Sequence, residues 1–302
     1  MRVLIPGGTG MIGTALSKSL LADGHQVWVL SRNPRSARLP EGARVVGWDG
    51  RSSLGWGELA GQVDAVVNLV GERLSKWPWT KRQKRHFLDS RVECGGALVE
   101  AIQASSTPPK VLIQASGVNY YGPHGLTPVS EAEAPGNDFL AELCKVWEAS
   151  TEPVEKLGVR RVIVRSAIVL SARQGILPIM LFPVRIFAGG PLGSDRQGLP
   201  WIHLEDEVAA IRFLLENESA SGPFNLTAPG LVSSADFNRA AAKTLHRPYW
   251  LPVPAFMLRL VLGEMSTLVL DGVYLQPERL QELGFHFRFE TVEAALGDLL
   301  VS

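Results

Sequence analysis

The chain has 302 residues, and its 30 Lys and Arg balance 30 Asp and Glu, so the formal net charge is zero. This length suits one large domain or two smaller ones, and 46% hydrophobic with 20% charged residues is typical of a folded globular protein. Balanced charge argues against a non-specific binder of nucleic acid or anionic membranes. A small anion needs only a few local cations, so such a ligand stays possible.

The chain offers little material for a metal site or a disulfide framework. Cys94 and Cys144 are its two cysteines, they form no CxxC motif, and the six histidines show no close pairing. No apolar run approaches the ~20 residues of a membrane span, and no signal-peptide hydrophobic region fits at the N-terminus. We therefore expect a cytoplasmic protein without a metal, and no membrane partner.

The first half alternates short apolar runs with longer amphipathic stretches. The predicted strands cover residues 3–6, 26–30, 44–47, 65–70, 111–115 and 161–169. The predicted helices cover residues 12–23, 81–104 and 139–157. The strands are rich in Val and Ile at successive positions, as expected where helices cover both faces of a sheet. The alternation predicts an α/β fold, a doubly wound parallel sheet of the Rossmann type.

The second half has a different pattern. Four prolines and many glycines interrupt regular structure in 171–200, a helix is predicted at 204–217, a strand at 223–227 and a last helix near 291–300. We predict a dinucleotide-binding domain over 1–170, completed by about 201–228. Segments 171–200 and 229–302 are expected to form a smaller C-terminal lobe that binds the substrate.

The most informative motif is the glycine-rich segment 7–13, Gly-Gly-Thr-Gly-Met-Ile-Gly, which follows a predicted strand and opens a predicted helix. Glycines at this turn let the backbone approach a pyrophosphate, and the helix N-terminus favours an anion. A glycine-rich turn without a ligand is the plainer alternative. The residues expected at the pyrophosphate are Gly7, Thr9, Gly10, Met11, Ile12 and Gly13.

The end of the second strand indicates which nicotinamide cofactor is bound. An acidic residue there would hold the ribose hydroxyls of NAD, but this strand ends in Ser31 and Arg32. A hydroxyl and a guanidinium suit the 2′-phosphate of NADP(H), which we therefore expect as the cofactor. A solvated basic turn is the alternative.

Several further segments carry a family resemblance over essentially the whole chain. They are Asp64–Gly71, Asp89–Arg91, Ser116–Gly122, Val164–Ser166, Trp201–His203 and Gln276–Leu280. With the glycine-rich segment, they resemble the extended short-chain dehydrogenase/reductase superfamily, and in particular its sugar-nucleotide epimerase-like subfamily, also described as cell-division inhibitor-like. The resemblance implies an NADP-binding doubly wound sheet with a small lobe closing over a substrate.

The resemblance also implies further cofactor contacts. Leu69, Val70 and Gly71 would line the adenosine and ribose side, Arg91 would face the cofactor, and Val169 would pass near the nicotinamide. The placements at strand ends agree with the general position of ligands in such sheets.

In this superfamily a Ser or Thr orients the substrate, a Tyr transfers the proton, and a Lys four residues later holds the nicotinamide ribose. Lys145 matches that lysine and is expected to bind the cofactor, but Ala141 occupies the tyrosine position. The Ser/Thr position holds Gly117, with Ser116 one place earlier. Strand alternation would turn Ser116 the other way unless a bulge re-aims it.

Tyr120 and Tyr121 are candidate substitutes for the missing tyrosine, with Ser116 and Lys145 completing the predicted catalytic set. Equally, one tyrosine could pack in the fold while the other lines the pocket without reacting. Two functions therefore stay open. One is an NADP-dependent oxidoreductase or epimerase acting on a sugar nucleotide or similar polar carbonyl compound. The other is an NADP(H)-binding regulatory or partner-binding protein with little turnover.

Overall fold

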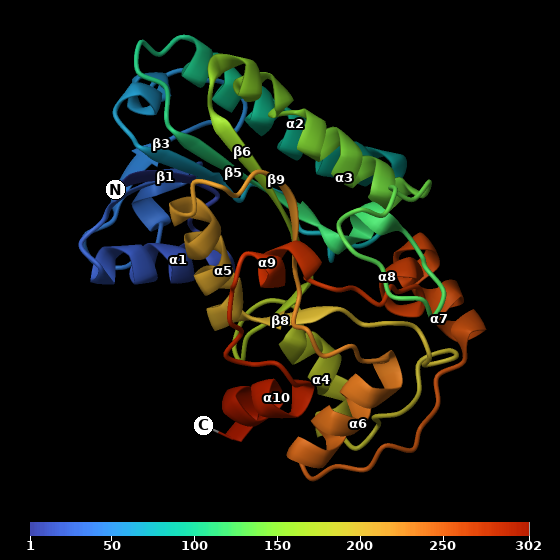
Figure 1. The fold of residues 1–302 in the computed structure, drawn as a ribbon. Coiled ribbons are helices and arrows are strands. Elements are labelled where there is room, and N and C mark those ends of the chain that lie inside the picture. The colour runs from blue at the N-terminus through green and yellow to red at the C-terminus, as the bar shows by residue number, and fades with distance from the viewer. Residues whose placement is uncertain (302) are drawn as a thin grey trace.

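The computed structural model describes residues 1–301. Within these residues the main sheet has seven parallel strands in the order β3-β2-β1-β4-β5-β6-β9 (Figure 1). The strands are Arg2–Pro6 (β1), Gln26–Ser31 (β2), Arg44–Gly47 (β3), Ala65–Asn68 (β4), Val111–Gly117 (β5), Arg160–Ser166 (β6) and Gly222–Leu226 (β9). The predicted doubly wound parallel sheet is confirmed.

Four helices cover the two faces of this sheet. They are Met11–Ala22 (α1), Lys81–Gln103 (α2), Phe139–Ala149 (α3) and Leu204–Glu216 (α5). Figure 1 shows α1 and α5 side by side on one face and α2 with α3 on the other. Because side chains alternate along each strand, Val3 and Ile5 pack toward α1 and α5, whereas Leu4 packs toward α2.

The predicted strand 161–169 is wrong in its length. β6 ends at Ser166, and Ile168–Leu170 (β7) pairs instead with Trp201–His203 (β8) in a separate two-stranded sheet. The change occurs at Ala167, whose amide bonds to the carbonyl of Leu226, whereas the next amide bonds to that of Pro200.

Two other predicted elements are shorter than expected. β4 stops at Asn68, because the Asn68 side chain accepts a hydrogen bond from the Val70 amide at 3.2 Å. Helix α3 ends at Ala149, and the rest of the predicted helix 139–157 is a 3-10 helix over Glu152–Leu157 that begins around Pro153.

The smaller lobe contains β7, β8 and the remaining helices. They are Leu177–Arg185 (α4), Ser234–Thr244 (α6), Ala255–Leu262 (α7), Thr267–Leu270 (α8), Glu278–Glu282 (α9) and Val292–Val301 (α10). Its core packs α4 and α6 against α10. Segment 171–200, predicted as interrupted, therefore holds one helix with Pro183 inside it.

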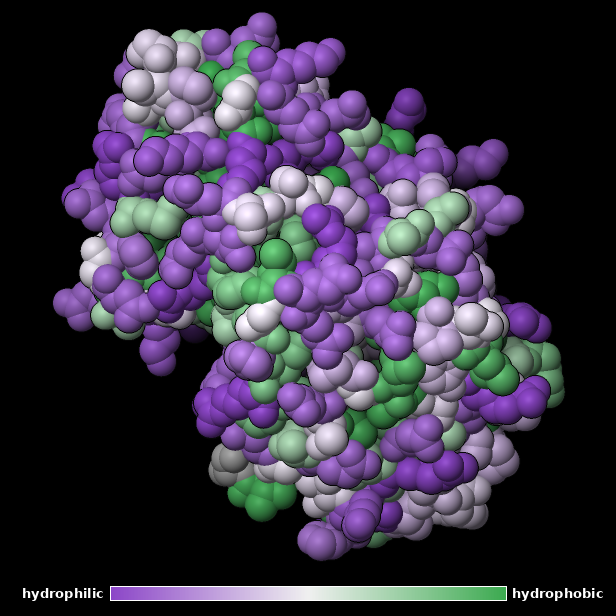
Figure 2. All heavy atoms as spheres, viewed as in Figure 1, coloured by the Kyte–Doolittle hydropathy of each residue, from purple (hydrophilic) through white to green (hydrophobic). Residues whose placement is uncertain are grey.

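The surface of this lobe is notably apolar. Exposed hydrophobic side chains concentrate in α7 and around α4, where Leu260 is 83% and Phe182 61% exposed. Figure 2 shows the resulting hydrophobic clusters on the lower lobe, including its right edge where Figure 1 places α7. No helix within residues 1–301 is long and apolar enough to cross a membrane.

The C-terminal part of this lobe is hydrogen-bonded to the last strand of the main sheet. Arg279 donates to the carbonyls of Pro223 and Ser221, and the Asn225 amide side chain donates to the carbonyl of Gln276. These bonds join α9 directly to β9.

A buried ion pair joins β6 to α3. Arg165, 4% exposed, donates from Nε to Glu148 Oε1 at 2.9 Å and from Nη2 to Oε2 at 3.0 Å. Its Nη1 also donates to the hydroxyl of Tyr121 at 3.0 Å. Tyr121 in turn donates to Asn225 of β9 at 2.6 Å, so one network spans α3, β6 and β9.

We predict that Glu148→Ala destabilises the protein by about 3–5 kcal/mol, because it leaves the Arg165 charge buried and unpaired. Urea unfolding followed by circular dichroism measures this. The matched control is Glu155→Ala, which removes the 2.6 Å pair of Arg161 with a glutamate that is 49% exposed and should cost less than about 1 kcal/mol. Equal losses in the two variants would contradict the assignment.

Candidate functional site

The candidate site lies at the carboxyl edge of the main sheet, where the strand order reverses. β1 continues through α1 on one face to β2, whereas β4 continues through α2 on the other face to β5. The crevice between β1 and β4 is therefore the topological switch point, where open α/β sheets bind their ligands.

The glycine-rich segment occupies this point. A Cβ on Gly7, whose φ is +79°, would lie 2.7 Å from the Leu69 carbonyl carbon, and one on Gly13 would lie 2.5 Å from the Gly8 Cα. Only glycines permit these approaches of β1, β4 and α1. The backbone of Leu69 is thus packed against the loop.

Gly10 plays a different part. It is the N-cap of α1, it offers no side-chain cap, and the nearest atom to an added Cβ is the Gly7 oxygen at 3.4 Å. The first amides of α1, those of Met11, Ile12 and Gly13, precede its first intrahelical bond from Thr14. They form a ready anion site beside the exposed Thr9.

The remaining predicted contacts of the cofactor border the same edge. Ser31 ends β2 and is 8% exposed, and its hydroxyl accepts the Asn33 amide at 3.2 Å. Arg32 is exposed, with its aliphatic stem against Gly50. Val169 lies in β7, and its carbonyl approaches Gly175, which also contacts Met11 at the start of α1.

Arg91 is buried and its guanidinium bonds to groups of the protein itself, whereas an arginine that binds a ligand directly would be exposed at the site. Its guanidinium donates to the carbonyls of Phe87 and Glu72 and packs on the Trp147 ring, 4.4 Å from the ring centre. Burial lowers its pKa to about 10. A Cβ added at Gly71 would lie 3.0 Å from the Arg91 guanidinium. Arg91 therefore packs directly against the backbone of residues 70–72, which borders the site.

Three of the four predicted catalytic residues contact the Arg165–Glu148 pair, whereas Lys145 is engaged elsewhere. Ser116 points toward α3 and donates to Glu148 at 2.7 Å, as strand alternation indicates. Tyr121 is fully buried, and burial raises its pKa to about 12. Lys145 is half-exposed and pairs with Glu142 at 2.6 Å. Ser116 and Tyr121 thus belong to the buried network.

Tyr120 is the candidate that stays partly accessible. Its ring lies under the Arg165 guanidinium at 3.4 Å and meets the Tyr121 ring edge-on at 5.3 Å. Gly117, at the end of β5, leaves an ordinary contact of 3.9 Å between an added Cβ and Cys144 of α3. Ala141 is fully buried, so no side chain replaces the missing tyrosine at that position.

Three charged residues of this region escaped the sequence analysis as functional groups. Arg165 interrupts an apolar strand, which is a signal for a buried partner, and Glu148 supplies that partner. Glu207 lies on the apolar stripe of α5 one turn before Ile211, and it is fully buried. Outside these three, His203 caps α5 by accepting the Glu205 amide.

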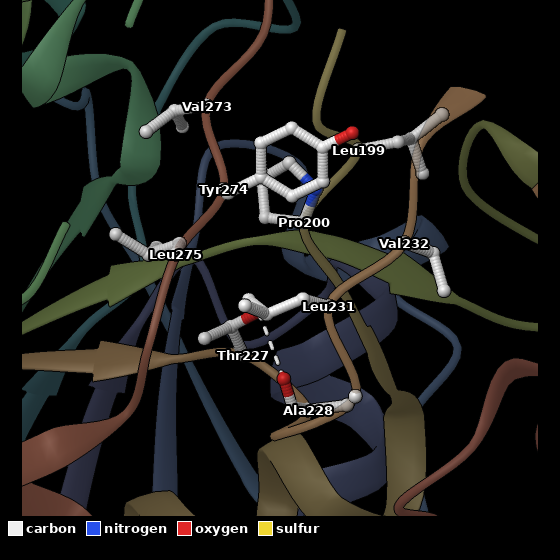
Figure 3. Close-up of a pocket in the computed structure, with 10 residues that line it drawn as sticks. Leu199, Pro200, Thr227, Ala228, Leu231, Val232, Val273, Tyr274 and Leu275 are labelled. Atoms are coloured by element: carbon white, nitrogen blue, oxygen red, sulfur yellow. Dashed lines mark hydrogen bonds between the residues drawn. The ribbon is translucent and has the colours of Figure 1, made fainter. Parts of the chain in front are cut away.

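A crevice between the lobes is too narrow for a ligand. Figure 3 shows segments 199–200, 227–232 and 273–275 converging around it, and it has no room for a water molecule. Within residues 1–301 no group of His, Cys, Asp and Glu side chains is arranged to hold a metal ion. A second cavity of about 410 Å³ lies by β9 and α9, lined by Glu131, Pro223 and Arg279, away from the glycine-rich segment.

Comparison with known proteins agrees with this geometry. The chain is 37% identical over 301 residues to Epimerase family protein YfhF of Bacillus subtilis, covering 99% of this chain and 98% of that protein. It superposes on the crystal structure of human epimerase family protein SDR39U1 with NADPH, with a TM-score of 0.87, 33% identity and 99% of both chains covered.

More distant structures share the fold alone. The UDP-glucose 4-epimerase of Thermotoga maritima, solved with UDP-glucose, has a TM-score of 0.79 at 16% identity and covers 98% of this chain and 97% of that one. Residues 253–299 match a domain family described as of unknown function, DUF1731. Residues 3–227 match the model described as the NAD dependent epimerase/dehydratase family, and the chain belongs to that family.

Proposed function

We propose that this protein binds NADP(H) across the carboxyl edge and transfers a hydride to or from a polar carbonyl or hydroxyl compound, with a sugar nucleotide as the substrate class. The observation that carries the proposal is the uncapped N-terminus of α1 at Gly10, held against Leu69 by glycines that leave no space for a side chain. This arrangement fits a pyrophosphate in charge and in shape.

NADP(H) is preferred over NAD(H) because β2 ends at Ser31 and is followed by Arg32, with no carboxylate at either position. An exposed guanidinium with its stem fixed beside Gly50 can pair with a 2′-phosphate. The 33% identical human relative solved with NADPH supports the same choice. The free, buried Cys94 and Cys144 suit the reducing cytoplasm.

The substrate would lie between this edge and the smaller lobe, in which β7 and β8 join the predicted segments 171–200 and 229–302. Arg185 and Arg196 are exposed in the first of these segments and suit a diphosphate. The bound cofactor would supply or accept the hydride. Tyr120 would orient the reacting oxygen, and Lys145 of α3 would approach the ribose once it exchanges Glu142 for the ligand.

Ala141, at the position of the superfamily's tyrosine, favours a second possible function. With no tyrosine at this position and with Tyr121 committed to Arg165, the protein could instead be an NADP(H)-binding regulator with little turnover. Losing a positioned acid or base typically lowers a rate by about 10²–10⁴. Nucleic acid is not an expected partner under either function.

Two glycine variants test the phosphate loop. Gly10→Ala should fold normally, because its φ of −77° is ordinary and its Cβ has space, yet its methyl group would enter the pyrophosphate position. We expect at least about tenfold weaker NADPH binding by calorimetry. Gly13→Ala should instead lose about 1–3 kcal/mol of stability through overpacking. Wild-type affinity in Gly10→Ala would refute the assignment.

Thermal-shift measurements test the cofactor preference. A ligand at 100 times its Kd stabilises the protein by about 2.7 kcal/mol, so NADPH should raise Tm clearly and NADH less. Arg32→Ala should remove most of the difference, because it removes the cation at the 2′-phosphate. Arg38→Ala, another exposed arginine of the same loop, is the matched control. An equal shift with NADH in the wild type would contradict the preference.

Phe variants separate the two tyrosines. With NADPH and keto-sugar nucleotides, or with NADP⁺ and sugar nucleotides that carry the corresponding hydroxyl, Tyr120→Phe should lower kcat, whereas Tyr121→Phe should lower stability by about 1–3 kcal/mol and leave kcat near the wild-type value. Steady-state absorbance of NADPH measures the first effect and urea unfolding the second. An unchanged kcat in Tyr120→Phe would remove that residue from the reaction.

A further inference from the structure

Glu207 is a carboxyl group without contact to solvent, in the first turn of α5. Because α5 leads from the carboxyl edge of the sheet to the start of β9, its first turn lies at that edge. α1 begins at the same edge with the glycine-rich loop and packs against α5 (Figure 1). Glu207 therefore lies beneath the proposed ligand edge.

Glu207 is connected to this edge by one hydrogen bond. Its Oε1 accepts the Ser166 hydroxyl at 2.6 Å, and its Oε2 is buried without a hydrogen-bond partner among residues 1–301. Ser166 is the last residue of β6, it lies opposite Gly117 of β5, and it is partly exposed. A single side chain thus separates the buried carboxyl group from the ends of β5 and β6.

Burial raises the pKa of Glu207 to about 8, and only the Ser166 hydrogen bond lowers it. Among residues 1–301 no cation compensates for the burial. α1 contributes only Lys18, which is exposed, and β5 and β7 contribute no titratable group. Of the neighbouring β6 and β8 residues, Arg165 pairs with Glu148, and the His203 ring interacts with Glu205 and Asp298.

The remaining arginines of β6 are also engaged elsewhere. Arg160 bonds to carbonyls at the far end of α5, and Arg161 pairs with Glu155. Asp206, the neighbour of Glu207 on α5, accepts the amides of Arg288 and Phe289. Glu207 is accordingly an isolated titratable charge.

The position of this charge relative to the cofactor rests on the proposed function. A dinucleotide at the switch point places its pyrophosphate on α1 and its 2′-phosphate near Ser31 and Arg32. Its nicotinamide half must then extend over the other half-sheet, toward the ends of β4, β5 and β6. Ser166 lies at that end, with Glu207 directly behind it.

We propose that Glu207 sets the redox preference of the bound cofactor. As a carboxylate it stabilises the cationic ring of NADP⁺, and as a neutral acid it gives NADP⁺ no advantage over NADPH. The Kd ratio of NADP⁺ to NADPH should therefore fall by about tenfold as pH rises through the titration of Glu207. By linkage, NADP⁺ binding should release a proton that NADPH binding does not.

Calorimetric Kd values for NADP⁺ and NADPH between pH 6 and pH 9.5 test this proposal. The 2′-phosphate is common to both ligands, so its own titration cancels in the ratio. Glu207→Gln should make the ratio independent of pH. Glu131→Gln is the matched control, since Glu131 is also buried with a raised pKa but bonds to the amides of Asn225 and Arg279.

Ser166→Ala provides a second variant that retains the carboxyl group. It removes the bond that lowers the pKa of Glu207, so the midpoint of the ratio should move to higher pH. The unliganded protein gives an independent check. The pKa of Glu207 in the folded protein lies above the ordinary 4.5, so the folded state loses stability as pH rises from about 4.5 to about 8. Relative to Glu207→Gln, the unfolding constant of the wild type should therefore rise by about tenfold per pH unit over this range.

The possible outcomes distinguish a failure of the proposed cofactor binding from a failure of the role proposed for Glu207. If neither cofactor form binds, the proposed function fails, and the role of Glu207 fails with it. If both bind with a ratio that does not vary with pH, or that varies equally in Glu207→Gln, only the role of Glu207 is overturned. An unmoved midpoint in Ser166→Ala would also overturn it.

Discussion

The candidate site depends on the ion pair between Arg165 and Glu148. Burying two charges costs several kcal/mol per ion, and their mutual attraction offsets this only when every polar atom is well placed. Here Ser116, Tyr121 and both carboxylate oxygens complete the arrangement. The pair thereby fixes the ends of β5 and β6 relative to α3, and a substrate or a nicotinamide would meet those ends.

Although the net charge of the chain is zero, the two halves of the carboxyl edge of the sheet differ in their charged and polar groups. At one half, the first amides of α1 and the exposed Arg32 favour phosphate groups. At the other half, the Ser166 hydroxyl donates to the buried Glu207, and under the role proposed for Glu207 this half would favour a ring that carries positive charge in its oxidised form. On that proposal, the two halves would match the opposite charges of the two ends of one ligand.

The sequence predicted the parallel sheet and the phosphate loop because both depend on local patterns. Apolar runs of Val and Ile mark buried strands, and glycines between a strand and a helix mark the loop. It did not separate the tyrosines or reveal the change of sheet at Ala167, because both depend on partners distant in sequence. Tyr121 is held by Asn225, 104 residues later.

The burial of Glu207 could not be predicted from the sequence either. A glutamate on an amphipathic helix is normally solvated, and only the packing of α5 beneath Ser166 makes this one buried. Residues such as Glu207 and Tyr121, whose pKa values are raised by burial, are thus the ones whose environment the local sequence pattern does not predict.

The bonds from Arg279 and Asn225 restrict how the lobes can move. They tie α9 to β9 by backbone carbonyls, so a hinge that swings the whole C-terminal part away from the sheet would have to break all of them together. Motion that admits a substrate then falls to α7, in which no side chain is buried, rather than to α4, whose Leu177 and Leu181 pack in the core of the smaller lobe. The smaller lobe thus combines α9, which is bonded to the sheet, with α7, which packs loosely enough to move.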